Sequence, residues 1–309
     1  MGKVAFLFAG QGAQHPGMCA DLIESEPAAK AVFDMADAVR PGTTEQCLSG
    51  TKEELAQTIN TQPCVFAADL ACARALVARG VTPDVVAGFS LGEIPALAFA
   101  GAYDGMTGFR LACARGASMA RAGKNVNASM AAIVKLPDET VERLCAAYDH
   151  VWPVNYNCDG QIAVSGDRDE LERLYADVAA AGGRSMPLNV SGGFHSPYMD
   201  PASAEFGAIL ADTPLQKPLF PAYANRTAEP YGENVRELLT QQINHPVRWK
   251  ETLRHLNEQG FDTFVECGAG MVLCKLVRKN LPECRSFAVD SLAGLAKLQE
   301  EGLLCCSAT

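Results

Sequence analysis

One serine stands in a setting that favours nucleophilic chemistry. Ser90 is the centre of Gly88-Phe89-Ser90-Leu91-Gly92, which satisfies the pattern G-x-S-x-G. A serine on a sharp turn from a strand into a helix needs small flanking residues, and such a turn exposes the hydroxyl at the start of the helix. An apolar run precedes this motif and a helical pattern follows it. The alternative is an ordinary glycine-rich turn with a serine cap, and the context favours the nucleophile.

A serine nucleophile needs a base, and a neutral histidine is the usual one at about pH 7. His195 follows a glycine pair at the point where a small inserted segment rejoins the main pattern, and clefts form at such boundaries. His15 and His245 also lie on predicted loops and stay open as alternatives. The other two histidines, His150 and His255, are expected to be solvated.

Backbone N–H groups near Ser90 could hold the oxyanion of an acyl-transfer reaction. The N–H of Leu91 follows the nucleophile directly, and a second donor could come from the turn Gly10-Gln11-Gly12. That turn does not match a nucleotide-binding loop, because His15 stands where G-x-G-x-x-G needs glycine and no Gly-Lys-Ser/Thr follows.

Alternating strand and helix patterns must position these groups. Buried strands are predicted at 3–9 and 83–88, with helices at 21–40, 51–60, 63–79, 93–100 and 106–122. The pattern resumes after residue 190, with helices at 201–211, 235–243 and 247–259 and strands at 221–224 and 263–266. Such alternation predicts an α/β fold with a parallel sheet covered by helices.

The segment 128–190 follows a different pattern. Strands at 131–136, 152–157, 161–166 and 184–190 and helices at 137–148 and 168–181 give the order β-α-β-β-α-β, which is ferredoxin-like. Asp159-Gly160 between the central strands is a hairpin signal. We therefore expect a small ferredoxin-like subdomain at 128–190, inserted into a core formed by 1–127 and 191–309.

Composition excludes several other classes. The 309 residues carry 26 Lys and Arg against 36 Asp and Glu, a net charge of −10, so nucleic acid is not expected as a partner. No apolar run approaches the ~20 residues that cross a bilayer, and no signal segment is evident, so we expect a cytoplasmic protein without a membrane partner. The twelve cysteines never form CxxC, which favours small buried side chains over a metal site.

Five motifs occur together in one order along this chain. They are Gly10-Gln-Gly-Ala-Gln14, Gly88-Phe-Ser-Leu-Gly-Glu93, Arg115-Gly116, Phe194-His-Ser196 and Asn244-His-Pro-Val-Arg-Trp249. In these motifs the chain resembles the malonyl-CoA:acyl carrier protein transacylases, from Val4 to about Lys279. The resemblance implies an α/β-hydrolase-like core that carries the ferredoxin-like insert, with the active site between them.

The resemblance also implies roles for individual residues. Ser90 matches the nucleophile and His195 its base. Gln11 and Leu91 match the residues whose N–H groups form the oxyanion hole. Gln242 matches the residue whose backbone carbonyl orients the histidine, in place of the aspartate of a hydrolase triad.

Two further residues match those that select the substrate. Arg115 corresponds to the arginine that binds the substrate's free carboxylate, which a planar guanidinium can hold bidentately. Phe194 corresponds to a residue typical of malonyl-selective members, where a ring crowds an α-methyl branch worth about 1–3 kcal/mol. The chain departs from the family at Phe89, where histidine is usual, and at Pro95, which is expected to remove one hydrogen bond from the following helix.

The implied function is transfer of malonyl from malonyl-CoA to the phosphopantetheine thiol of an acyl carrier protein for fatty-acid biosynthesis. It proceeds through a malonyl-serine ester and needs neither metal nor cofactor. Alternatives are a discrete acyltransferase of polyketide biosynthesis, a serine thioesterase and a non-catalytic carrier-binding scaffold. Because carriers in this family are acidic, Lys275, Arg278 and Lys279, spaced i, i+3, i+4, form the hypothesised docking patch, with Arg226 or Arg184 as additions. A solvated helix face is the competing interpretation.

Overall fold

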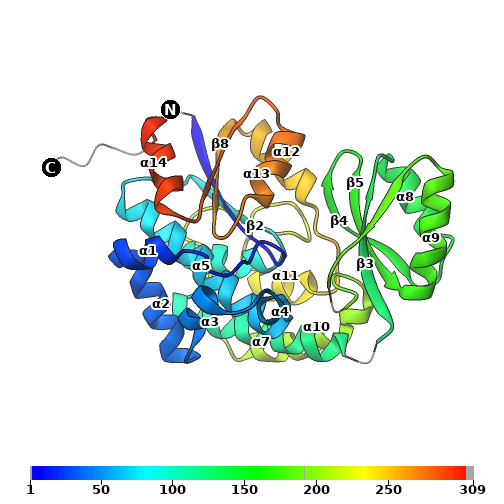
Figure 1. The fold of residues 1–309 in the computed structure, drawn as a ribbon, viewed down its shortest axis with the longest axis horizontal. Coiled ribbons are helices and arrows are strands. Elements are labelled where there is room, and N and C mark those ends of the chain that lie inside the picture. The colour runs from blue at the N-terminus through cyan, green and yellow to red at the C-terminus, as the bar shows by residue number, and fades with distance from the viewer. Residues whose placement is uncertain (1, 125, 191, 304–309) are drawn as a thin grey trace.

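A five-stranded parallel sheet forms the centre of the computed structural model, which describes residues 2–124, 126–190 and 192–303 (Figure 1). The strand order is β7-β2-β1-β8-β9, and every neighbouring pair runs parallel. The carboxyl ends of all five strands therefore meet at one edge. The strands span Lys3–Phe8 (β1), Val85–Gly88 (β2), Ala222–Tyr223 (β7), Phe261–Cys267 (β8) and Arg285–Val289 (β9).

Helices cover both faces of this sheet, which confirms the predicted α/β class. Alternate residues of β1 point to opposite faces, so Phe6 packs with the buried residues of α5 and α6 while Leu7 packs with those of α12 and α13. The helices of the core span Ala20–Ser25 (α1), Pro27–Val39 (α2), Thr43–Ser49 (α3), Lys52–Ala56 (α4), Thr58–Ala78 (α5), Glu93–Phe99 (α6), Gly105–Gly123 (α7), Asp200–Ala211 (α10), Val235–Gln242 (α11), Trp249–Glu258 (α12), Val272–Asn280 (α13) and Leu292–Glu300 (α14).

Two of the predicted helix boundaries are wrong. The single helix predicted at 21–40 is divided into α1 and α2, because Glu26 precedes Pro27 and takes an extended conformation with φ −113° and ψ 105°. The break expected before Pro63 lies instead at Gln57, and Pro63 is inside α5. Because α5 is buried along most of its length, its packing outweighs the one hydrogen bond that the proline removes.

A second sheet, antiparallel throughout, forms the smaller unit. Its order is β4-β5-β3-β6, so the first and third strands of the segment are central, as the predicted ferredoxin-like pattern requires. The last strand ends at Pro187, three residues before its predicted end. The boundaries of the two units stay a prediction. The elements span Ala128–Val134 (β3), Asp138–Cys145 (α8), Val151–Cys158 (β4), Gln161–Asp167 (β5), Arg168–Ala180 (α9) and Arg184–Pro187 (β6).

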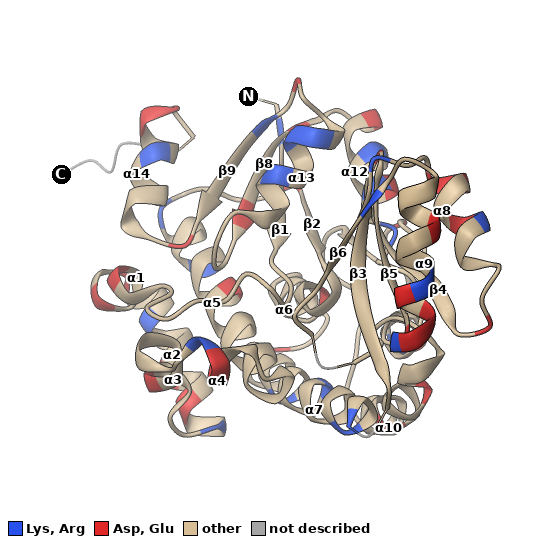
Figure 2. Ribbon diagram, turned by 45° about the vertical axis from the view of Figure 1, so that its right-hand side comes forward, with Lys and Arg blue, Asp and Glu red and all other residues tan. Residues whose placement is uncertain are grey.

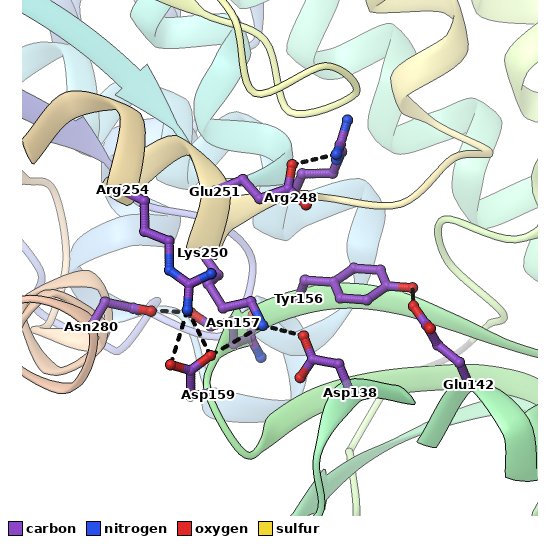
Figure 3. A network of polar contacts seen from close by, with 10 residues as sticks. All are labelled: Asp138, Glu142, Tyr156, Asn157, Asp159, Arg248, Lys250, Glu251, Arg254 and Asn280. Atoms are coloured by element: carbon purple, nitrogen blue, oxygen red, sulfur yellow. Dashed lines mark hydrogen bonds and ion pairs between the residues drawn. The ribbon is translucent and has the colours of Figure 1, made fainter. Parts of the chain in front are cut away.

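Polar contacts from α12 join the subdomain to the core (Figure 3). Lys250, which is 8% exposed, pairs with Asp138 at the start of α8 and with Asp159 in the β4–β5 turn at 3.2 Å. Arg254 donates to both carboxylate oxygens of Asp159 at 2.9 Å. Backbone hydrogen bonds on both sides of Val247 tie the start of this segment to β4. The core and β4 are therefore held together by main chain and by charge.

The cysteines behave largely as expected. Of the ten in the described part of the chain, eight are buried, and Cys113 and Cys284 are half-buried. Cys305 and Cys306 lie outside the described residues. Across the described ranges, no helix combines the length and the apolar character that a membrane span requires.

Candidate functional site

Ser90 lies on a tight turn at the carboxyl edge of the parallel sheet. It follows β2 directly and begins a short 3-10 helix, Ser90–Gly92 (η1), with a left-handed φ of 53°. A Cβ on Gly88 would lie 1.9 Å from the carbonyl carbon of Gly92, and a Cβ on Gly92 would lie 2.1 Å from the carbonyl oxygen of Phe8. Both glycines of the motif are therefore required, because the turn closes on itself and on β1.

His195 contacts the Ser90 hydroxyl. The distance from Ser90 Oγ to His195 Nε2 is 2.7 Å, and Nδ1 lies 2.9 Å from the backbone oxygen of Gln242 and 3.2 Å from that of His245. Since both carbonyls accept, Nδ1 carries the proton and Nε2 accepts from the serine. Burial, with the nearby Arg115 charge, lowers the pKa of His195 to about 4, so the ring is neutral at about pH 7.

Arg115 is buried at the same point and does not lie on a helix surface. It is 1% exposed on α7, and Nη2 donates to Ser90 Oγ at 3.2 Å and to Gln242 Oε1 at 2.8 Å. Burial lowers its pKa to about 10, which leaves the guanidinium charged at about pH 7. Among the described residues its Nε finds no hydrogen-bond partner. The site thus holds a cation with unused donor capacity beside the serine.

Gln242, the last residue of α11, contacts all three of these side chains or their backbones. Its carbonyl accepts from His195, its side-chain oxygen accepts from Arg115, and its side-chain amide donates to the backbone oxygen of Ser90. The last of these bonds fixes the peptide unit that carries the Leu91 N–H. The family resemblance implied a role for the carbonyl alone, and the structure adds the contacts of the side chain.

A cavity of about 90 Å³ opens beside Ser90 and is walled by both units. The core contributes Phe194, and the subdomain contributes apolar side chains together with Asn155. The lining residues are Gln11, Phe89, Ser90, Met130, Asn155, Leu188, Val190, Phe194 and His195. The cavity therefore lies between the core and the insert, where the resemblance implied the active site.

The two residues expected to supply oxyanion-hole N–H groups flank the nucleophile turn. Leu91 is the second residue of η1, where N–H groups lack a partner within the helix. Gln11 lies in the loop after β1, and the two loops touch, since a Cβ on Gly10 would lie 2.6 Å from the carbonyl oxygen of Phe89. The Gln11 side chain turns toward Thr58 Oγ1, at 3.4 Å.

The two departures from the family pattern leave these contacts intact. The Phe89 ring packs edge-on against Trp249, with centroids 5.4 Å apart, and lines the cavity. Pro95 is the third residue of α6. Inside α6 the missing N–H has no i−4 partner, because the first N–H groups of a helix have none. The i−4 residue of Pro95 is Leu91 in η1, which runs directly into α6, so the expected loss of a hydrogen bond stays a prediction for that junction.

The remaining histidines do not approach Ser90 through their rings. The side chain of His15 is 46% exposed and lies 3.8 Å from Asp290, and that of His150 is 60% exposed. His245 contributes only its carbonyl. His255, expected to be solvated, is half-buried and donates to the Ala228 carbonyl at 2.8 Å, because α12 packs its side chain against that turn.

Two asparagines at the site were not predicted from the sequence. Asn155 on β4 is 9% exposed, lines the cavity, and its Oδ1 has no hydrogen-bond partner in the described part of the chain. Asn225, just after β7, contacts the backbone of the Ser90 turn. Neither lies in a motif, and only the folded arrangement brings them to Ser90.

The fold and the site together define an acyl transferase. A family model described as "Acyl transferase domain" matches residues 5–305 of this chain. The malonyl CoA-acyl carrier protein transacylase of Bacillus subtilis is 36% identical over 299 residues, which cover 94% of this chain and 94% of that protein. This chain belongs to the family of malonyl CoA-acyl carrier protein transacylases.

Solved structures of this family superpose on nearly the whole chain. The malonyl CoA-acyl carrier protein transacylase from Clostridium perfringens has a TM-score of 0.94 at 32% identity, covering 97% of this chain and 96% of that one. A malonyl-transacylase in complex with a type II PKS acyl-carrier protein has a TM-score of 0.93 at 34% identity, covering 97% of this chain and 99% of that one.

Proposed function

We propose that this chain transfers a malonyl group from malonyl-CoA to the phosphopantetheine thiol of an acyl carrier protein, through an ester on Ser90. The observation that carries the proposal is the convergence on one hydroxyl. Ser90 Oγ lies 2.7 Å from a neutral His195 nitrogen and 3.2 Å from the buried cation of Arg115. The first contact supports attack on a thioester, and the second supports recognition of an acyl group with a free carboxylate.

In the first step His195 Nε2 takes the proton of the Ser90 hydroxyl as Oγ attacks the thioester carbonyl. The N–H groups of Leu91 and Gln11 hold the oxyanion of the tetrahedral intermediate. The carbon–sulfur bond then breaks, and CoA leaves as a thiol with the proton from His195. The carrier thiol reverses this sequence, since His195 takes its proton, sulfur attacks the ester, and Ser90 Oγ leaves reprotonated. No metal ion or cofactor enters the scheme.

Arg115 holds the malonyl carboxylate while these steps occur. Within the described ranges its Nε has no hydrogen-bond partner and its Nη2 is shared between Ser90 and Gln242, so a carboxylate can take up donors that the protein leaves incompletely used. Phe194, which lines the cavity, crowds an α-methyl branch and favours malonyl over methylmalonyl.

Intact-mass measurement tests the proposal. The protein and Ser90→Ala are incubated in parallel with malonyl-, methylmalonyl- and acetyl-CoA, and a phosphopantetheinylated carrier is then added. We expect the mass of one malonyl group on the unchanged chain, none on Ser90→Ala, and removal of the adduct by the carrier thiol. An adduct that hydrolyses equally fast without carrier indicates a thioesterase, and no adduct at all indicates a scaffold.

The carriers used should come from both fatty-acid and polyketide synthesis. Fatty-acid biosynthesis is the proposed pathway, and the solved complex with a type II PKS acyl-carrier protein makes the polyketide carrier the matched comparison. A higher kcat/KM with the fatty-acid carrier supports the proposed pathway, and the reverse order contradicts it. A cytoplasmic location, where malonyl-CoA and carrier would meet, stays a prediction.

The carrier docks, in this proposal, on the α13 patch, defined as Lys275, Arg278 and Lys279. All three residues are exposed, and the Lys and Arg positions of α13 are blue in Figure 2. Arg278 also donates to Ser286 at 3.1 Å and Lys279 to Gln161 at 2.8 Å, so Lys275 has the greatest freedom to meet an acidic partner.

Charge reversal tests the patch. We expect the double variant Lys275→Glu and Arg278→Glu to raise the KM for carrier at low salt while leaving the rate of serine acylation by malonyl-CoA unchanged. Lys297→Glu, an exposed lysine on α14, is the matched control. An unchanged KM for carrier in the double variant indicates a solvated helix face.

A further inference from the structure

Asn225 owes its place beside the nucleophile to the pairing of two parallel strands. Val86 and Ala87 of β2 lie level with Ala222 and Tyr223 of β7. Continued past both strand ends, this register brings Asn225 beside the turn that carries Ser90. The edge strand β7 has two residues, and Asn225 follows it after one residue.

The side-chain amide of Asn225 spans the nucleophile turn. Its Oδ1 accepts from the Ser90 N–H at 2.6 Å and its Nδ2 donates to the Gly88 carbonyl at 2.6 Å. The residue is 1% exposed, so water does not compete for either bond. A non-glycine residue at the φ of 53° found for Ser90 is strained by about 1–3 kcal/mol, and such a conformation persists only where its surroundings enforce it.

Two buried side chains hold Asn225 itself. Glu93, on the helix that follows the nucleophile, accepts from the Asn225 backbone N–H at 2.9 Å through Oε1. The Tyr231 hydroxyl donates to the same oxygen at 2.5 Å. A chain of hydrogen bonds therefore runs from Tyr231 through Glu93 and Asn225 to the backbone of Ser90. None of these three side chains lines the cavity, so the hydrogen bonds reach the nucleophile from the side of the turn that faces away from the cavity.

We propose that Asn225 is a positioning residue for the nucleophile, which keeps Ser90 in its left-handed conformation and its hydroxyl within reach of His195. The inference rests on the proposed function. Asn225 touches neither acyl group nor base, so its loss should slow ester formation and leave substrate affinity nearly unchanged. A misplacement of about 1 Å at a reacting group can cost ~10²-fold in rate.

The test compares Asn225→Ala, Tyr231→Phe and the double variant. Single-turnover formation of the malonyl-enzyme is followed by intact mass over a range of malonyl-CoA concentrations, with melting temperature recorded for each protein. We expect Asn225→Ala to lower the limiting acylation rate ~10²-fold with an unchanged half-saturation concentration. Tyr231→Phe should lower it roughly two- to tenfold, since it removes one support of Asn225. In the double variant the tyrosine change should have no further effect, because the two act through one path.

A matched control separates positioning from stability. Asn60 on α5 also bridges two groups, accepting from Arg40 Nη2 at 2.9 Å and donating to the Glu54 carbonyl at 3.0 Å. Asn60→Ala should keep the acylation rate, whatever its melting temperature. If the unchanged chain forms no adduct, the proposed function fails first. If it does and folded Asn225→Ala acylates within threefold of it, or the Tyr231→Phe effect adds in full to that of Asn225→Ala, the positioning role is overturned. Should Asn225→Ala not fold, an unaltered rate in Tyr231→Phe overturns it.

Discussion

Replacing Arg115 by alanine tests the proposed carboxylate site through its selectivity. The guanidinium is 1% exposed and charged, so a malonyl carboxylate bound beside Ser90 in the variant would lie buried without its cation. Loss of one partner of such a pair costs about 2–5 kcal/mol. A central value of about 3–4 kcal/mol corresponds to a kcat/KM for malonyl-CoA that is ~10²- to 10³-fold lower.

Acetyl-CoA has no carboxylate, and its transfer should respond much less. The variant loses the hydrogen bond from Arg115 to Ser90 Oγ at 3.2 Å, which is worth about 1 kcal/mol or roughly fivefold. Arg115→Lys keeps the charge but not the planar fork, so an intermediate loss of roughly tenfold with malonyl-CoA is expected. The assay is the initial rate of adduct formation with each thioester, and Arg110→Ala, an exposed arginine on α7, is the control.

The same variant should change the pH profile of acetyl transfer. Burial and the Arg115 charge both lower the pKa of His195, to about 4, so removing the charge moves that pKa back toward its usual value of about 6.5. Since His195 must be unprotonated to act as base, the acid limb of kcat/KM shifts to higher pH. Equal losses with malonyl-CoA and acetyl-CoA, without this shift, would refute the assigned role and leave Arg115 a structural residue.

Three other changes have defined outcomes. In a mass assay with both substrates present, Phe194→Ala should raise the ratio of methylmalonyl adduct to malonyl adduct roughly tenfold or more. Burial raises the pKa of Glu93 to about 7, so its stability contribution falls as pH rises from about 4.5 to about 7. In urea unfolding, the free energy of unfolding of Glu93→Gln should therefore rise by about 3 kcal/mol relative to that of the unchanged chain as the pH goes from about 5 to about 8. Lys250→Met leaves the largely buried Asp138 without its cation and should lower the free energy of unfolding by about 2 kcal/mol. Lys30→Met, at an exposed lysine, should change that free energy by under ~0.5 kcal/mol.

Local chemistry explains which parts of the fold the sequence predicts. The parallel sheet, the antiparallel subdomain and the turn at Ser90 all follow from apolar periodicity and from glycines whose Cβ atoms would collide. The division of α1 from α2 was also encoded, because Pro27 excludes its predecessor from the helix. The helix α3, the edge strand β9 and the helix α14 were not predicted. These short or peripheral elements depend on packing against neighbouring elements, such as α2 and α5 for α3, more than on their own pattern.

The site was predictable only in part, because its polar residues come from distant segments. The residues around Ser90 indicate a nucleophile, and the family resemblance implied the roles of Arg115 and Gln242. Asn225 and Asn155 carry no local signal, since one depends on the register between β2 and β7 and the other on how β4 is held to the core. These two asparagines reach the site only when strands that are far apart in the sequence are paired.

The proposed mechanism gives a physical reason why a neutral carbonyl, and not a carboxylate, orients His195. A carboxylate in place of the Gln242 carbonyl would lie close to Arg115, whose Nη2 already reaches the Gln242 side chain at 2.8 Å. It would pair with the guanidinium and compete with the malonyl carboxylate for the same donors. Carbonyls orient Nδ1 without neutralising the cation, and Glu93 fits the same logic, because at a pKa of about 7 it is largely protonated below neutrality. The substrate then brings the missing negative charge, which also stabilises the imidazolium that forms as Ser90 attacks. The variant Gln242→Glu puts an acid on the side chain that already accepts from Arg115, so it should weaken malonyl transfer more than acetyl transfer, as Arg115→Ala does, although the cation is still present.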